Sequence, residues 1–434
     1  MRIIVFFLII SATLVWQACS SKFSPQTGNH HPPSDLRQTE GELYFPDVSK
    51  SLPDEKCDSS SWEYISAAEA GFDEQKLNQV IDFIAERDQH TTAFVVLYKG
   101  KIIREWYAGN IDLDEYNSTV NTGQLQQSNW DCNTADRIHS TTKSIVSLTI
   151  GIAQEEGLLS LNEPVGQYLG KWTDLPQADE DLIKIKHLLT MTSGLDGAPA
   201  GGGNFETPDG RIKGIPQGAD FQKPATAWFY NTTAYHRLFE VIEKVGQDKR
   251  AYIKEKIFDR IGMNDSVVLN QSVASSARDM ARFGLLVLSQ GKWNNDTIVS
   301  PSFIQQATSS YLNLPDFSGL NLDKMNPSYG FLFWLNGKSS WKSGQCFNNL
   351  GELKDSQFCM EGESAGKFNG PLIPEAAQDL IAALGLGDKK IYIVPSLDLV
   401  IARHGNPPKG SAIQFAESSL DLILWQKLMS ARNE

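Results

Sequence analysis

The chain has 434 residues, of which 41% are hydrophobic and 21% charged, so it can bury an ordinary core and is not wholly disordered. At roughly 150 residues per domain, this length indicates two or three domains, or one domain with a large insertion. The net charge of −13 argues against a nucleic-acid partner and against binding to an anionic membrane surface, because both require clustered Lys and Arg.

The N-terminus is typical of an export signal. Arg2 precedes an apolar run from Ile3 to Val15, which is too short to span a bilayer but suits a signal peptide. The following Gln17-Ala18-Cys19 resembles a lipoprotein signal, in which Cys19 becomes the lipidated first residue; cleavage of an ordinary secretory signal nearby is the alternative. We therefore predict a signal peptide over 1–18.

Residues 19–60 are predicted to form a lipidated, flexible tether, because they are rich in Ser, Pro, Asn and Gln and have no apolar periodicity. Ser20, next to Cys19, resembles the sorting choice for the outer membrane. We expect an exported protein on the periplasmic face of a bacterial envelope, anchored in the outer membrane and touching the membrane through its lipid only.

Four cysteines remain after Cys19, namely Cys57, Cys132, Cys346 and Cys359. An even number in an exported chain indicates disulfides. Because Cys346 and Cys359 are close in sequence, Cys346–Cys359 with Cys57–Cys132 is the preferred pairing, and the other two connectivities stay open. The irregular spacing without a Cys-x-x-Cys pair predicts no metal site.

The elements expected in chain order are a helix over Phe72–Arg87 with Asp73 as its cap, then a hairpin around Lys99-Gly100. A mostly helical middle follows, over roughly 140–300. The chain ends with a second hairpin around Pro395-Ser396 and a helix over Ile413–Met429. Strands at both chain ends predict one antiparallel sheet, closed by distant segments and flanked by helices. The strands of the two hairpins are Ala93–Tyr98, Lys101–Tyr107, Lys389–Val394 and Leu399–Arg403.

Ser140 and Lys143 form the first candidate nucleophile motif. Residues three apart share a helix face, so Ser140 at a helix start would have the Lys143 amine beside its hydroxyl. The positive end of the helix dipole favours oxyanion character there, and a desolvated lysine loses its proton readily. The same spacing also occurs at Ser289/Lys292, Ser339/Lys342 and Ser364/Lys367, so spacing alone is a weak signal.

The segment Gly362–Gly366 competes, because its Gly-x-Ser-x-Gly pattern fits the nucleophile elbow of α/β-hydrolases, with Ser364 as nucleophile and His404 as a base. An elbow requires a buried strand before it and a helix after it. The preceding residues are short and polar, and Gly370-Pro371 breaks helices, so a surface loop is the better interpretation.

Ordered sequence blocks favour Ser140. Together they resemble the β-lactamase-related serine hydrolases: class C β-lactamases, DD-peptidases, family VIII esterases and 6-aminohexanoate-dimer hydrolases. The resemblance covers roughly 65–430. The blocks are Arg137–Ser144 (RIHSTTKS), Gly157–Leu169 (GLLSLNEPVGQYL), Ile183–Leu195 (IKIKHLLTMTSGL), Pro224–Tyr235 (PATAWFYNTTAY), Ser276–Leu288 (SARDMARFGLLVL), Tyr329–Trp334 and the hairpin Ile391–Gly405.

This resemblance implies a fold of the α/β class, β-lactamase/transpeptidase-like, with an antiparallel sheet flanked by helices and an inserted, mostly helical domain. It places the serine hydrolase domain at 61–434 and the inserted helical part at about 160–300.

The resemblance also assigns roles. Ser140 is implied to be the acyl-accepting nucleophile, Lys143 its base, and Tyr230 the tyrosine of the second motif, acting as a phenolate-like base shared with Lys143. The family usually has Tyr-x-Asn, whereas this chain has Tyr230-Asn231-Thr232, so Thr232 would supply only a shorter hydroxyl. Asn231, Thr232 and Trp228 are candidates for the substrate pocket.

The third motif of the family, Lys-Thr-Gly or His-x-Gly, corresponds to Ala383–Gly387, which has no Lys or His. The missing cation would have anchored a carboxylate. The chain therefore resembles the 6-aminohexanoate-dimer hydrolase and esterase branches more than penicillin binders. Gly385 is a further pocket candidate, and the backbone N–H groups of Ser140 and Leu386 are the expected oxyanion donors.

Three histidines are not assigned to catalysis. His404 lies at the end of the last strand and His187 in a helix-starting block, so both are interpreted as structural. His139 precedes Ser140, and neighbouring residues do not share a helix face.

The predicted function is hydrolysis of a small-molecule ester or amide through an acyl-enzyme on Ser140, without metal or cofactor. One alternative is a β-lactamase or DD-peptidase acting on cell-wall-type substrates. Another is a non-catalytic envelope binding module that keeps the fold. Natural substrate and oligomeric state are left open.

Overall fold

The structure is a computed structural model. The predicted signal peptide over 1–18, the predicted lipidation site Cys19, and also Cys359 and Ser364 lie outside the described residues, so predictions on them stay predictions. The described residues are 43–48, 57, 61–121, 123–195, 207, 210–212, 223–317, 325–337, 340–347, 353–354, 365–368, 371–411 and 418–433.

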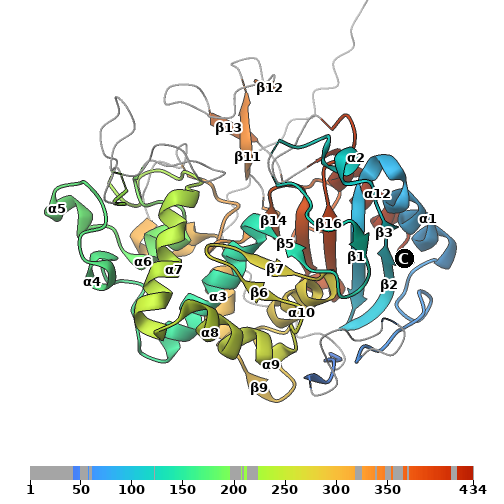
Figure 1. Cartoon of the computed structure of the whole chain (residues 1–434), viewed down its shortest axis with the longest axis horizontal. Helices are drawn as coiled ribbons and strands as arrows, with labels where there is room; N and C mark the ends of the chain where they lie inside the picture. The colour runs from blue at the N-terminus through green and yellow to red at the C-terminus, as the bar shows by residue number, and fades with distance from the viewer. Residues whose placement is uncertain are drawn as a thin grey trace, which may run out of the picture. The chain divides into compact units, whose positions relative to one another are not determined.

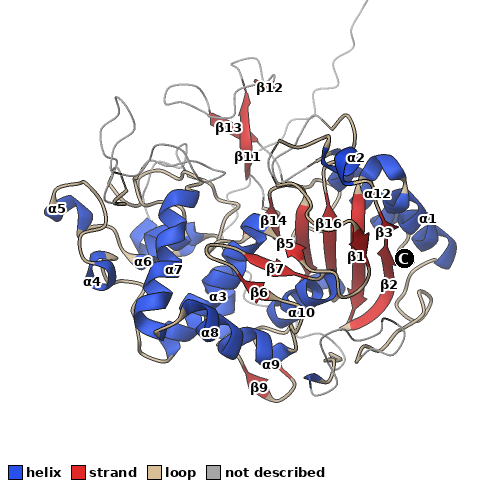
Figure 2. Ribbon diagram, viewed as in Figure 1, coloured by secondary structure: helices blue, strands red, loops and turns tan. Residues whose placement is uncertain are grey.

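A six-stranded antiparallel sheet organises the described part of the chain (Figure 2). Its strand order is β10, β14, β15, β16, β1, β2. Strand β1 pairs with β16, so that Val96 lies opposite Ile401 and the two ends of the chain meet inside the sheet. The predicted hairpins and the closure by distant segments are confirmed. The strands are β1 Thr91–Tyr98, β2 Lys101–Tyr107, β10 Trp334–Leu335, β14 Ile381–Gly385, β15 Lys389–Val394 and β16 Leu399–Gly405.

Helices cover both faces of this sheet (Figure 1). The helix α1 (Glu74–Ala85) begins at the predicted cap, because the Asp73 carboxylate accepts the Lys76 N–H at 2.8 Å. It packs with α12 (Ser419–Ser430) on one face. On the other face, α10 (Ala277–Leu288) packs against β1, β15 and β16, and all its residues are buried.

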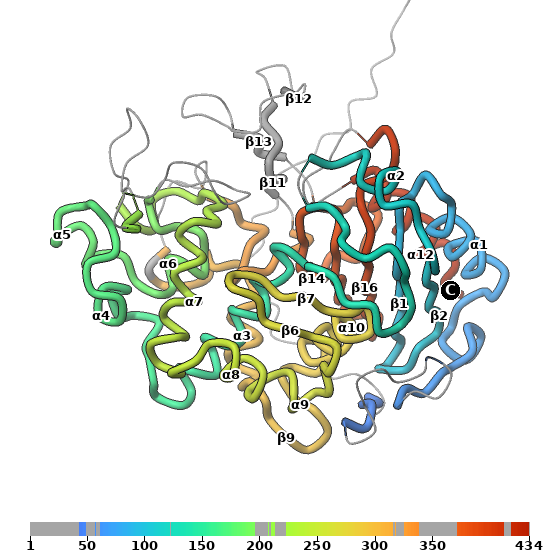
Figure 3. The backbone as a smooth tube through the Cα atoms, in the orientation of Figure 1, coloured from blue at the N-terminus to red at the C-terminus, as the bar shows by residue number. Residues whose placement is uncertain are grey.

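The helical part lies beside the sheet and centres on α3 (Thr142–Glu155), against which α7 (Thr232–Gly246) and α11 (Pro301–Ala307) pack (Figure 3). Every residue from Thr142 to Ala153 is buried. The shorter helices are α2 Leu113–Asn117, α4 Gly166–Leu169, α5 Gln177–Glu180, α6 Ile185–Leu189, α8 Lys249–Ile253 and α9 Asp259–Ile261, with a π-helical turn over Lys254–Phe258.

Short strands complete the fold. They are β5 (Asp136–Arg137) with β7 (Val273–Ser275) and β6 (Val267–Val268); β3 (Gly109–Asn110) with β4 (Asn129–Trp130); β8 (Lys292–Trp293) with β9 (Asp296–Thr297); and β11 (Ser340–Phe347) with β12 (Leu353–Lys354) and β13 (Ala365–Phe368).

Two predicted boundaries need correction. The inserted helical part was expected to reach residue 300, but α10 belongs to the layer on the sheet, because all its residues are buried and it packs against β1, β15 and β16. The flexible tether was expected to reach residue 60. Instead, Leu43 and Phe45 pack on the core, and the Tyr44 N–H donates to the Lys99 carbonyl at 3.0 Å, so residues 43–48 are anchored.

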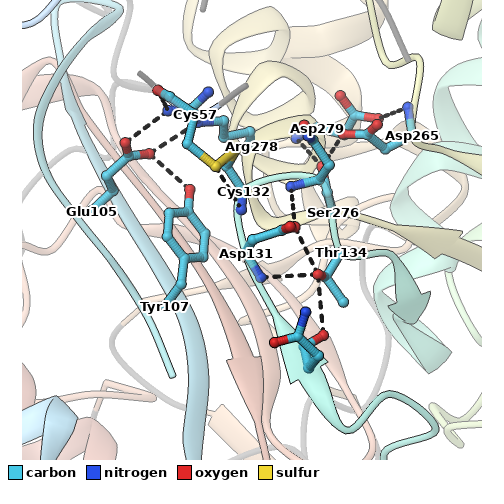
Figure 4. Close-up of a disulfide and its surroundings, with 12 residues drawn as sticks. Cys57, Glu105, Tyr107, Asp131, Cys132, Thr134, Asp265, Ser276, Arg278 and Asp279 are labelled. Carbon is cyan, nitrogen blue, oxygen red and sulfur yellow. Dashed lines mark hydrogen bonds and ion pairs between the residues drawn. A yellow bond between two sulfur atoms is a disulfide. The ribbon is translucent and has the colours of Figure 1, made fainter. Parts of the chain in front are cut away.

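A disulfide joins Cys57 to Cys132, with Cα atoms 5.7 Å apart, which confirms one predicted pair (Figure 4). Arg278 of α10 donates to the Cys57 carbonyl at 3.0 Å and pairs with Glu105 of β2 at 2.7 Å. The disulfide therefore joins Cys57 to the segment between β4 and β5, and that segment leads on to Ser140. Cys346 lies in β11, but nothing is described of its side chain.

Among the described residues, no helix combines the length and the apolar character that crossing a membrane requires.

The disulfide should stabilise the fold through the unfolded state, because it closes a loop between residues 75 positions apart. We expect the Cys57→Ser/Cys132→Ser double variant to lose about 2–4 kcal/mol of unfolding free energy, measured by urea unfolding under oxidising conditions. A loss below about 0.5 kcal/mol, the size of an ordinary surface substitution, would contradict this role.

Candidate active site

Ser140 lies in a turn of 3₁₀-helix, His139–Thr141, that runs directly into α3. The preceding His139 has a φ of +47°, in the left-handed region that few non-glycine residues adopt. Such backbone strain is concentrated at functional turns. Ser140 is half-buried, so its hydroxyl is supported by the fold and still reachable from solvent.

Lys143 is the nearest titratable neighbour of Ser140. Its Nζ lies 2.9 Å from Ser140 Oγ and donates to Thr232 Oγ1 at 3.0 Å. The side chain is 2% exposed. One helical turn therefore brings the amine to the hydroxyl, as the Ser-x-x-Lys spacing predicted.

Burial controls the charge of this amine. It lowers the pKa of Lys143 from 10.5 to about 7, because desolvation disfavours the ammonium. The ring centroids of Tyr230 and Tyr235 lie 4.9 and 4.4 Å from Nζ, contacts that favour the cation and oppose the effect of burial. A substantial neutral fraction at neutral pH makes Lys143 fit to act as a base.

Tyr230 occupies a different protonation state from the one expected. It is fully buried in the aromatic cluster, and burial raises the pKa of its phenol, although a hydrogen bond with Ser140 opposes the shift. A phenolate-like base is therefore wrong for this geometry. The Tyr230 phenol remains protonated at neutral pH and reaches the site through its hydrogen bond with Ser140, although Tyr230 is not among the residues that line the cavity.

The second motif places Thr232, not Asn231, beside the lysine. Thr232 begins α7 and accepts from Lys143 as described above. Asn231 caps this helix: its Oδ1 accepts the Ala234 N–H at 2.9 Å, and its Nδ2 donates to the Leu195 carbonyl at 2.9 Å. Asn231 is therefore a structural cap and does not line the cavity, which corrects its pocket prediction.

A cavity of about 280 Å³ opens beside Ser140. It brings together residues from the nucleophile turn, α3, α7, the loop between β6 and β7, and the turn after β14. The lining residues are Arg137, His139, Ser140, Lys143, Thr232, Tyr235, His236, Leu269, Asn270, Gln271, Ser272 and Leu386.

The edge strand β14 lies close to the nucleophile turn. A Cβ added to Gly385 would meet the Ile138 carbonyl oxygen at 2.3 Å and Thr141 Oγ1 at 2.9 Å, so only glycine permits this approach. Leu386, the next residue, lines the cavity with Ser140. The role of the Ser140 and Leu386 backbone N–H groups as oxyanion donors stays a prediction, whereas Gly385 itself serves the close packing and does not line the cavity.

Trp228 was a pocket candidate, and the structure places it elsewhere. It is 7% exposed and packs among Tyr230, Tyr329 and Trp334, with ring centroids 5.4–6.3 Å apart. It does not line the cavity. Its large apolar surface is used to hold Tyr230 in position.

His404 and His187, both interpreted from the sequence as structural, each hydrogen-bond to the backbone. His404 is fully buried in β16, with Nε2 at 2.8 Å from the Ser275 carbonyl oxygen. The Nδ1 of His187 accepts the Lys184 N–H at 3.1 Å and closes a helix N-terminus. Neither histidine lines the cavity at Ser140.

Several lining residues have no recognisable signal in the sequence. Tyr235 and His236 follow the second motif on α7, where a helical pattern alone predicts core packing. Asn270 and Gln271 lie in a short loop without any motif, and they reach the cavity only through tertiary packing. Burial lowers the pKa of His139 and of His236 to about 3, so both are neutral.

Within the described parts of the chain, no group of three or more His, Cys, Asp or Glu side chains is arranged to hold a metal ion.

Comparison with known proteins identifies the family. A model of the family described as beta-lactamase matches residues 78–403, which is well over half of the chain. A candidate penicillin-binding protein, PbpX of Bacillus subtilis (strain 168), is 33% identical over 127 residues. The match covers 29% of this chain and 31% of that protein, so the chain spans about a third of the length of this relative.

Solved structures show the same fold. A candidate beta-lactamase from Bacteroides dorei DSM 17855 aligns with a TM-score of 0.56 at 14% identity, covering 84% of this chain and 100% of that one. A candidate 6-aminohexanoate-dimer hydrolase from Bacillus anthracis aligns with a TM-score of 0.53 at 17% identity, covering 88% of both chains. At these identities the likeness concerns the fold, and the predicted β-lactamase/transpeptidase-like architecture is confirmed.

The hydrogen bond from Lys143 to Thr232 should fix the amine against Ser140. We expect Thr232→Val, which keeps the volume and removes the acceptor, to slow reaction of Ser140 with a fluorophosphonate about tenfold at pH 9. Thr232→Asn, which restores the side chain usual in the family, should retain most of the rate. Equal rates in the wild type and Thr232→Val would contradict a positioning role for Thr232.

Proposed function

The chain belongs to the beta-lactamase family, whose members are generally serine hydrolases, and we propose that it cleaves an ester or amide bond through an acyl-enzyme on Ser140. The observation that carries the proposal is the 2.9 Å approach of the buried Lys143 amine to Ser140 Oγ at the wall of a cavity. A nucleophile beside its base, with space for a reacting carbonyl, is the arrangement that acyl transfer requires.

Acylation begins when the neutral Lys143 amine takes the Ser140 proton as Oγ attacks the substrate carbonyl carbon. The resulting oxyanion is held by the backbone N–H groups of Ser140 and Leu386. Lys143 becomes an ammonium at this stage, and its Thr232 contact keeps it in place. The low-dielectric surroundings make each of these interactions stronger than it would be in water.

The leaving group departs with a proton from Tyr230. The Tyr230 phenol donates to the departing oxygen or nitrogen as the carbonyl bond breaks, and the Lys143 ammonium returns a proton to the tyrosine. In deacylation water is the nucleophile and Ser140 is the leaving group: Lys143 takes a proton from the attacking water, the bond between the acyl carbon and Ser140 Oγ breaks, and the Lys143 ammonium returns that proton to Oγ as the acid forms. No step requires a metal or a cofactor.

A β-lactamase or DD-peptidase is supported less well. The turn after β14 has no Lys or His at the third motif to hold a substrate carboxylate. The lysines that follow are used elsewhere: Lys389 is fully buried and donates to the Gly123 carbonyl at 2.7 Å, and Lys390 pairs with Asp421 at 2.7 Å. A non-catalytic binding module would have no use for a neutral buried lysine beside a serine.

Labelling with a fluorophosphonate tests the proposal. We expect one adduct by intact mass on the wild type and on Ser364→Ala, and none on Ser140→Ala, because Ser140 lines a cavity and has the Lys143 amine at 2.9 Å from its hydroxyl. The Ser364→Ala variant is the matched control, since it removes the serine of the competing motif. Loss of the adduct in Ser364→Ala alone would overturn the site, and no adduct on any variant would overturn the function.

The pH dependence of labelling follows from the pKa of Lys143. Because the reactive form is the neutral amine, the rate should rise with pH, level off above about pH 7 and fall about tenfold per pH unit below it. His236→Gln should keep the inflection, since the pKa of His236 lies at about 3. An inflection that disappears in His236→Gln, or lies near 10, would contradict Lys143 as the base.

A further inference from the structure

The cavity at Ser140 carries the positive charge of Arg137, although the chain as a whole is acidic. The chain has 52 Asp and Glu against 39 Lys and Arg, yet no carboxylate is among the described residues that line this cavity. Its ionisable lining groups are the guanidinium of Arg137, the amine of Lys143, two histidines and a tyrosine phenol. An anionic part of a substrate would therefore meet no like charge there.

Arg137 is the exposed cation of this cavity. It lies in β5, three residues before Ser140 and opposite Ala274 of β7. Within the described ranges, its guanidinium has no ion pair. The adjacent Asp136 does not neutralise it, because that carboxylate is buried and accepts the backbone N–H groups of Gln126 and Arg137, both at 2.7 Å.

The loop Leu269–Ser272 is fixed against the nucleophile turn on the same side. The Ile138 N–H donates to the Val273 carbonyl at 3.0 Å, and the Val273 N–H donates to Thr142 Oγ1 at 3.0 Å. These bonds anchor the end of the loop whose Asn270 and Gln271 line the same cavity as Arg137. The wall thus combines a planar cation with neutral hydrogen-bond donors.

We propose that Arg137 anchors a carboxylate of the substrate, so that the natural substrate is an ester or amide that carries a carboxylate group. The inference rests on the proposed function. Arg137 would replace the cation that is missing from the turn after β14, from a different element. A guanidinium holds a carboxylate through two parallel hydrogen bonds, and the Asn270 and Gln271 amides can donate to the same group.

Two matched substrate pairs test this assignment and locate the carboxylate. The acyl-side pair is 4-nitrophenyl hemiglutarate and the neutral 4-nitrophenyl pentanoate. The leaving-group pair is 4-(butanoyloxy)benzoate and its neutral methyl ester. The measured quantity is the ratio of kcat/KM for the anionic member to kcat/KM for the neutral member. If turnover is too slow, the same ratio is taken from how strongly each member slows labelling of Ser140 by the fluorophosphonate.

We expect Arg137→Gln to lower this ratio about three- to tenfold in one of the two pairs, with Arg137→Lys intermediate, because lysine keeps the charge but not the planar fork. The pair that responds shows which side of the scissile bond carries the carboxylate. Raising the salt concentration should lower the wild-type ratio and leave that of Arg137→Gln nearly constant. Arg432→Gln is the matched control, since it removes an equally exposed guanidinium after α12 and should not change the ratio.

An unchanged ratio in both pairs would overturn the inference. So would a loss of activity shared equally by both members of each pair, which would indicate a structural role for Arg137. If wild-type Ser140 is labelled but neither pair responds to Arg137→Gln, the hydrolase proposal holds and only the carboxylate anchor fails. If wild-type Ser140 is not labelled at all, both are overturned.

Discussion

The site depends on the burial of one amine. Lys143 stands on a helix whose residues from Thr142 to Ala153 are all buried, and none of the described residues that line the cavity it faces is a carboxylate. Water is therefore excluded without a counter-charge to stabilise the ammonium, and the balance moves toward the neutral base. The aromatic rings of Tyr230 and Tyr235 complete the enclosure without supplying negative charge. The same exclusion of water keeps Tyr230 protonated, so a single physical effect sets both partners of Ser140 in the states that proton transfer requires.

The sheet and its small satellite strands bring the parts of the site together. Pairing of β1 with β16 joins an early and a late segment of the chain in one sheet. Strand β14 is the second strand from one edge of this sheet, and it lies against the turn that carries Ser140. The strands β5 and β7 hold that turn from the other side. Ser140 is thus fixed between two sheets, and Thr232 and Leu386, which line the cavity with it, come from segments about 90 and 250 residues away in sequence.

Local patterns predicted the elements with strong periodicity. The capped helix at Asp73, both hairpins and the Ser140–Lys143 spacing depend on neighbouring residues, so the sequence contains their signal. The wall formed by Leu269–Ser272 could not be predicted, because only packing against the nucleophile turn brings it to the cavity. Asn231 and Trp228 were predicted to line the pocket because they lie in or next to the second motif. The structure uses the first as a helix cap and the second as packing, roles that require knowledge of the turn geometry. The phenolate expected at Tyr230 failed because the depth of burial is a tertiary property.

The most direct test of this account is the ionisation of Lys143 itself. A ¹³C NMR titration of the lysine ε-carbons, with the Lys143 resonance assigned by its loss in Lys143→Arg, would measure its pKa in the free protein. The account predicts a pKa of about 7, far below the ordinary 10.5. A Lys143 resonance that titrates near 10 would mean that the amine is an ammonium at neutral pH, and it would contradict a lysine base for Ser140.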